Sequence, residues 1–250
     1  MKTFTKSLSG LLSASALAIG LSVIAQPAVA GIDGSLHDLA TTDTATTTAQ
    51  ICVFCHTPHG ANTLVEAPLW NKGSTGNSYG LYNSPTMDGV TSAGSVSLAC
   101  LTCHDGTQAR DNMINKPGSG GYNAAGSPLG TMGNMSGFGV ANLGTDLSND
   151  HPIGMTYCAA LDATAAEGGA CGDDSFSLNP LGGTAATRLW VDTGLLGAGT
   201  YEKTDMPLFN GGTGASVECA TCHDPHTPEN GTFLRVSNTG SALCLTCHTK

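Results

Sequence analysis

The stretch ICVFCHTPHG, residues 51–60, contains Cys52, Cys55 and His56 in the order Cys-x-x-Cys-His. Two thiols at this spacing can bond to the two vinyl groups on one edge of a porphyrin, and the next residue then lies where its imidazole can bind the iron. One such motif is compatible with chance or with half of a zinc site. The chain has four of them, so the sequence predicts four covalently bound c-type haems.

The four motifs provide eight attachment cysteines and four proximal histidines: Cys52, Cys55 and His56; Cys100, Cys103 and His104; Cys219, Cys222 and His223; Cys244, Cys247 and His248. The chain has eight histidines in all. The other four, which are His37, His59, His151 and His226, match the number of sixth iron positions. We therefore expect four bis-histidine haems of low potential, with Met155 as the competing ligand that would raise the potential of one of them.

Full ligation separates two classes of haem protein. A haem reductase or peroxidase needs an open or weakly held iron position, whereas an electron carrier needs every position filled. The histidine count therefore favours electron transfer and not an enzyme.

The motifs form two similar pairs. CVFCHTPH is followed by CLTCHDGT, CATCHDPH is followed by CLTCHTK, and a lone histidine precedes each pair. This order predicts two dihaem modules, at about residues 31–110 and 145–250, within a single tetrahaem domain spanning 31–250. It also suggests that His37 binds the first haem and His226 the fourth.

The N-terminal residues 1–30 have a basic start, a diluted apolar run and an Ala-x-Ala end, which are typical of a secretory signal peptide that is removed. No other stretch is long and apolar enough to span a membrane. Export to the periplasm or beyond agrees with haem attachment outside the cytoplasm. In that oxidising compartment, the two remaining cysteines, Cys158 and Cys171, are expected to form a disulfide, worth roughly 3 kcal/mol for a loop of about 14 residues.

The composition predicts a mostly irregular chain. Glycine accounts for 34 of the 250 residues, and residues 106–150 are expected to be loop almost throughout. We expect short strands at 95–99, 188–191 and 232–236 and short helices at the attachment motifs, all wrapped around a stacked chain of haems on which folding depends. The formal charge of −10 argues against nucleic acid as a partner and leaves basic proteins, minerals or copies of the chain itself.

The doubled motif arrangement, CVFCHTPHG, CHDPH and the terminal LCLTCHTK resemble the extracellular multihaem cytochromes of metal-reducing bacteria. The similarity is greatest to the tetrahaem members that polymerise into cytochrome nanowires. The resemblance implies a secreted subunit of a conductive filament that passes electrons to other cytochromes or extracellular acceptors. Monomeric periplasmic relatives share the motifs, so a tetrahaem electron shuttle is the alternative.

His59 follows His56 by three residues, one helical turn, so the two imidazoles lie on one side of a short segment. The two axial ligands of one iron approach from opposite faces of the porphyrin. His59 must therefore serve a different haem, either in its own chain or, as the resemblance implies, in the adjacent subunit.

The exported protein should have the mass of residues 31–250 plus four haems. Intact-mass measurement of the secreted protein tests both the cleavage site and the haem count. A mass that fits three haems, or an N-terminus that precedes Gly31, would contradict one part of this expectation.

Overall fold

The computed structural model describes residues 31–43, 48–85, 92–118, 121–127, 132–157, 181–184, 188–194, 200–209 and 215–249. The expected signal segment, residues 1–30, lies outside this part of the chain. So do Cys158 and Cys171, and their disulfide therefore stays a prediction.

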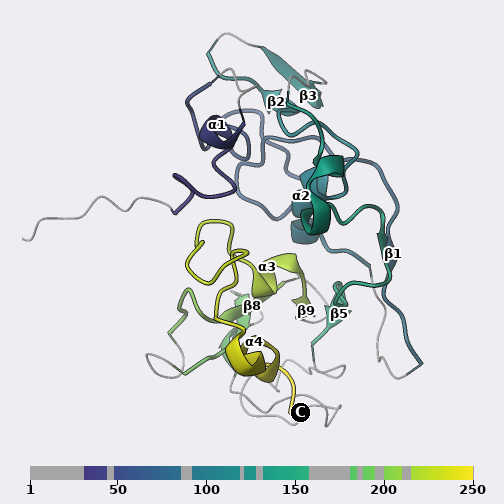
Figure 1. Ribbon diagram of the computed structural model, residues 1–250, viewed down its shortest axis with the longest axis vertical. Helices are drawn as coiled ribbons and strands as arrows, with labels where there is room; N and C mark the ends of the chain where they lie inside the picture. Colours follow the sequence, from purple (N-terminus) through teal and green to yellow (C-terminus); the bar gives the residue numbers. More distant parts are fainter. Residues whose placement is uncertain are drawn as a thin grey trace, which may run out of the picture.

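The protein is mostly coil with few short helices and short strands, as the composition predicted (Figure 1). The longest helix is α2, which spans ten residues. Among the described residues, none of the helices has the length and apolar character needed to cross a membrane. The helices are α1 (Leu39–Thr42), α2 (Ser95–His104), α3 (Cys219–Cys222) and α4 (Ala242–Leu245), with 3₁₀ turns η1 (Met135–Gly137), η2 (Gly139–Ala141) and η4 (Thr239–Ser241).

The described strands form four small sheets. Strands β2 and β3, β5 and β9, and β6, β7 and β8 pair antiparallel, whereas β1 and β4 pair in parallel. Figure 1 shows the N-terminal elements α1, β2, β3 and α2 towards one end of the long axis and α4 towards the other. The bounds are β1 (Gly80–Leu81), β2 (Met113–Asn115), β3 (Tyr122–Ser127), β4 (Asp146–Leu147), β5 (Met155–Thr156), β6 (Leu181–Thr184), β7 (Arg188–Val191), β8 (Met206–Leu208) and β9 (Ser216–Val217).

The expected strand at 188–191 is confirmed as β7. The expected strand at 95–99 is wrong, because these residues form the first turns of α2. The alternating sequence SVSLA favours a strand locally, but the helix that carries Cys100 and Cys103 extends back through it.

The expected strand at 232–236 is also wrong. Thr232 and Phe233 have φ values of 32° and 59°, which break an extended chain, and only an isolated bridge between Leu234 and His223 remains. Residues 106–150 are more ordered than expected, because they contain the β2–β3 hairpin, the 3₁₀ turns η1 and η2, and β4.

Two small apolar clusters replace one large core. One contains Phe54, Met113 and Met132, and the other surrounds Tyr157 and Val191 in the β6–β7–β8 region. Several large apolar side chains remain exposed, among them Leu36 and Leu64 at 77% and 80%. The dependence of folding on haem, expected from the composition, stays a prediction.

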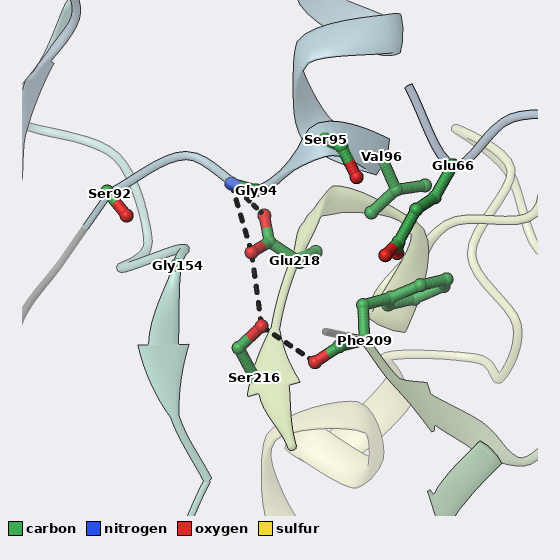
Figure 2. A pocket seen from close by; sticks show the side chains of 9 residues that line it. All are labelled: Glu66, Ser92, Gly94, Ser95, Val96, Gly154, Phe209, Ser216 and Glu218. Carbon is green, nitrogen blue, oxygen red and sulfur yellow. Dashed lines mark hydrogen bonds between the residues drawn. The ribbon is translucent and has the colours of Figure 1, made fainter. Parts of the chain in front are cut away.

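Glu218 joins the two halves of the molecule (Figure 2). This buried carboxylate accepts hydrogen bonds from the backbone N–H of Gly94 at 3.1 Å, from the hydroxyl of Ser97, and from Ser216 at 3.2 Å. Gly94 is the N-cap of α2 and Glu218 is the N-cap of α3. The carboxylate thus satisfies a free amide at the start of one helix while it caps the next. It lines a cavity of about 230 Å³ together with Glu66 and Phe209.

Replacing Glu218 with Ala should lower the free energy of unfolding by about 1–3 kcal/mol, because the Gly94 amide and the Ser97 hydroxyl lose their acceptor. Urea denaturation measures this loss. Glu66→Ala is the matched control, because Glu66 lines the same cavity with an exposed side chain. An equal effect of the two substitutions would contradict the role of Glu218.

The same carboxyl predicts a pH dependence. Burial raises the pKa of Glu218 above its usual 4.5, so the folded protein binds this proton more tightly than the unfolded chain. The stabilisation that this proton contributes is complete at a pH below the usual pKa of a glutamate. It is lost as the pH rises through the raised pKa of Glu218 in the folded protein. Between these two pH values, the wild-type protein should therefore lose stability relative to the Glu218→Gln protein, whose amide does not titrate. A difference in the free energy of unfolding that stays constant with pH would contradict the expectation.

Candidate haem-binding sites

Each attachment motif adopts a helical turn in which the histidine follows directly. The backbone N–H of the histidine donates to the carbonyl of the first cysteine in three motifs, at 2.9 Å for His56, 3.0 Å for His223 and 2.9 Å for His248. The second motif forms the end of α2, whose last residue is His104. Short helices occur at the second, third and fourth motifs as expected, whereas residues 51–55 form turns only.

Three proximal histidines are held in one tautomer. The Nδ1 atom donates to a backbone carbonyl in His56 (Pro68, 2.6 Å), His104 (Ala141, 2.8 Å) and His223 (Thr232, 2.8 Å). An imidazole that donates from Nδ1 has its Nε2 lone pair free for a metal ion. These residues therefore have the chemistry that a haem iron requires of its ligands.

The internal repeat is visible in the backbone. Thr57 donates to Leu69 and Asn71 donates to Cys55, both at 2.8 Å. Each of these bonds recurs in the second half. There Asp224 donates to Phe233 at 2.8 Å and Arg235 donates to Cys222 at 2.9 Å. Leu69 and Phe233, which correspond to each other, both have positive φ, at 55° and 59°. The first member of each motif pair is therefore built in the same way.

Six of the eight histidines face one another in pairs. The ring centroids are 6.1 Å apart for His37 and His104, 6.1 Å for His56 and His226, and 6.5 Å for His151 and His248. Two metal–nitrogen bonds of about 2 Å, with about 1 Å more from each nitrogen to its ring centre, separate two imidazoles on one metal ion by about 6 Å. Each pair is therefore spaced to hold one iron between its rings.

This pairing differs from the expected order of ligands. His37 faces the second motif and not the first, and His226 faces the first motif and not the fourth. The repeat order could not reveal this, because the second half of the chain folds back against the first. Met155 packs against the cluster around Tyr157 and Val191.

His59 and His223 face no other imidazole in the described part of the chain, and both are exposed. His59 does not follow His56 on a helix, as its spacing suggested, because residues 56–60 form a loop. The backbone carbonyl of His59 accepts hydrogen bonds from Thr57 at 3.0 Å and from Asn115 at 3.3 Å. The main chain at His59 is thus anchored while its imidazole faces outwards.

The electrostatics of the sites suit neutral ligands. Burial lowers the pKa of His37 to about 4, and the neighbouring His104 adds to this shift, so the ring is neutral at physiological pH. Asp38 fixes the position of this residue, because its carboxylate caps α1 through Thr41 at 3.2 Å and accepts from Gly34 at 3.0 Å. Burial also raises the pKa of Cys55 to about 11 and that of Cys222 to about 11, which disfavours thiolate ligands.

Two attachment sites from different halves meet where α2 packs on α3. A hydrogen bond between the thiols of Cys100 and Cys219 raises the pKa of Cys100 and lowers that of Cys219. Cys100 and Cys219 would hold the haems of the second and third sites, so these two sites are neighbours in the fold.

The sequence reasoning missed Asp224. Its carboxylate lies 3.4 Å from Nδ1 of His226, so it acts on a candidate ligand. The sequence could have indicated this role, because the first half has CHTPH where the second half has CHDPH, with a carboxylate beside its second histidine.

Comparison with known proteins identifies one family. The family described as "Doubled CXXCH motif" matches residues 213–250, which contain the third and fourth attachment motifs. No curated protein matches the chain. The match supports a multihaem c-type cytochrome with covalently bound haem.

Replacing His37 with Ala should open one iron to carbon monoxide in the reduced protein, because its ring faces that of His104. The Soret change on addition of carbon monoxide counts the open irons. The substitution should add no open iron in a protein that lacks the second attachment site through Cys100→Ser and Cys103→Ser. The outcome that would assign His37 to a different haem is one added equivalent of carbon monoxide in both the wild-type and the Cys100→Ser, Cys103→Ser protein. Mass measurement should then show three covalent haems in the latter.

Proposed function

We propose that this protein carries electrons through four c-type haems, each bound between two histidines, and that its copies join head to tail in an extracellular filament. The observation that carries the proposal is the arrangement of the imidazoles. Three facing pairs have the spacing of bis-histidine ligation, and the two that remain, His59 and His223, face no other imidazole in the described part of the chain.

When bound, c-type haem supplies an iron that gains and loses one electron. The facing imidazoles would hold the iron from both sides, and this would let it change oxidation state with little rearrangement of its ligands. Filled positions also exclude substrates from the iron. This favours an electron carrier over an enzyme.

The loop from His223 to His226 links two sites. His223 is the proximal ligand of the third site, and three residues later His226 faces the proximal ligand of the first site, His56. One short segment therefore brings two attachment sites close together. Together with the contact between Cys100 and Cys219, this favours a continuous path for electrons between the two halves.

The repeat suggests the task of His59. His59 stands in the first half where His226 stands in the second, and His226 faces the first site of the other half. If His59 likewise faces the first attachment site of the other half, its partner is the third site, at His223. Within the chain these two imidazoles do not face each other, so a second copy would bring them together.

The surroundings of His59 fit this role. Asn115, which binds the His59 carbonyl, ends β2, and β2 lies towards the end of the molecule opposite α4 (Figure 1). A contact between two different surfaces of the same chain is heterologous, and repeated addition then gives a linear polymer. One coordination bond would both join the subunits and extend the series of haems across the junction.

The partners of the filament follow from its charge and its export. Secretion through the periplasm, as the N-terminal segment predicts, would bring the protein to other cytochromes or to extracellular electron acceptors. The net negative charge favours basic protein surfaces or minerals.

Replacing His59 with Ala should abolish filaments, because no other ligand joins the copies. The monomer should keep four covalent haems and bind one equivalent of carbon monoxide after reduction. Electron microscopy and carbon monoxide titration measure the two effects. Added imidazole should close the open iron without restoring filaments.

His151→Ala is the matched control. It also opens one iron, but His151 faces His248 within the same chain, so filaments should persist. Normal filaments from His59→Ala would contradict the role of His59 at the junction between copies. A wild-type protein that stays monomeric at high concentration would favour the periplasmic shuttle.

A further inference from the structure

The two equivalent histidines His59 and His226 differ in what lies beside them. Thr57 occupies the position in the first half that Asp224 occupies in the second. The Thr57 hydroxyl donates to the carbonyl of His59, whereas the Asp224 carboxylate lies 3.4 Å from Nδ1 of His226. Only the second half therefore provides an anion for its candidate ligand.

The Asp224 carboxylate is well held. Its Oδ1 accepts from the backbone N–H of His226 at 3.0 Å, and its Oδ2 accepts from the hydroxyl of Thr227 at 3.0 Å. Arg235 approaches the same Oδ2 at 3.8 Å, but it also donates to the carbonyls of Ala220 and Lys203. The side chain of Asp224 is 16% exposed, so water screens this contact only in part.

The other tethered imidazoles donate to neutral acceptors. In His56, His104, His151 and His223 the Nδ1 partner is a backbone carbonyl. Within the described residues, His226 is the histidine whose Nδ1 faces a carboxylate. An anionic acceptor draws the Nδ1 proton and makes the imidazole a stronger electron donor through Nε2. Such donation stabilises ferric over ferrous iron, as does the negative charge itself.

We infer that Asp224 lowers the reduction potential of the iron held between His56 and His226 by accepting a charge-assisted hydrogen bond from Nδ1 of His226. Asp224 is a positioning and tuning residue, since it acts through His226 and does not touch the iron. The one-electron reduction itself is unchanged, because no bond forms or breaks and no proton leaves the pair.

The inference rests on the haem ligation proposed above and not on the filament. Its consequence is that the two repeats hold irons of different potential, although their backbones match. The site at His56 would accept an electron less readily than it would with a neutral acceptor beside His226.

The test is a spectroelectrochemical titration of the four-haem protein carrying Asp224→Asn or Asp224→Thr. Asn keeps an acceptor for the His226 amide without the charge, and Thr is the residue of the other repeat. One of the four potentials should rise by about 59 mV, a tenfold change in the one-electron equilibrium constant. Asp224→Glu should return it towards the wild-type value.

Glu229→Gln is the matched control, because it removes one negative charge from an exposed position three residues beyond His226. It should leave the four potentials nearly unchanged. The inference fails if no potential moves, if all four move equally, or if Asp224→Glu shifts the potential as much as Asp224→Asn. Carbon monoxide binding by Asp224→Asn would also overturn it, since Asp224 would then only hold His226 on the iron.

Failure of this test leaves the proposed function standing if the protein still has four closed irons. Failure of the proposed function would show instead as an open iron in wild-type filaments or as filaments from His59→Ala.

Discussion

The facing of imidazoles in pairs is the arrangement on which the rest of the proposed chemistry depends. Each pair joins parts of the chain that are far apart in sequence, such as His56 with His226 and His37 with His104. The protein also has hydrogen bonds of comparable reach at Glu218, whose carboxylate accepts from Gly94 and Ser97, 124 and 121 positions away. Its described apolar clusters are small, its sheets have two or three strands, and the buried carboxylate of Glu218 is the main polar junction between α2 and α3.

The small size of the described clusters and sheets agrees with the composition. A chain with 34 glycines and few regular elements among its described residues is expected to need haem to complete its core. Side chains such as Leu36, next to His37, stay exposed in the polypeptide and would be covered by a porphyrin. The chain then acts as a sheath in which short turns position ligands. Unusual backbone conformations at Leu69 and Phe233 set the carbonyls that orient the proximal imidazoles.

The sequence alone was sufficient for the attachment motifs, for the number of histidines and for the repeat, because covalent chemistry and spacing leave few alternatives. The assignment of His59 and His56 to different haems stays a prediction, and the helical turn from which it was argued is absent, because residues 56–60 form a loop. The sequence failed for the partners of His37 and His226, since pairing depends on how the two halves fold against each other. The helix at Ser95 and the broken chain at Phe233 were missed for a similar reason. Local alternation of apolar and polar residues predicted strands in both segments. In the structure, Glu218 caps the helix that begins at Ser95, and positive φ angles at Thr232 and Phe233 interrupt the other segment.

The central claim is that His59 of one copy and His223 of the next share one iron. Electron cryomicroscopy of the secreted protein tests it most directly. The account predicts a filament in which density joins these two imidazoles through a haem at every subunit junction, with the pairs at His104, His56 and His248 inside each subunit. A filament in which His59 faces solvent, or in which His223 finds its partner within its own chain, would contradict it.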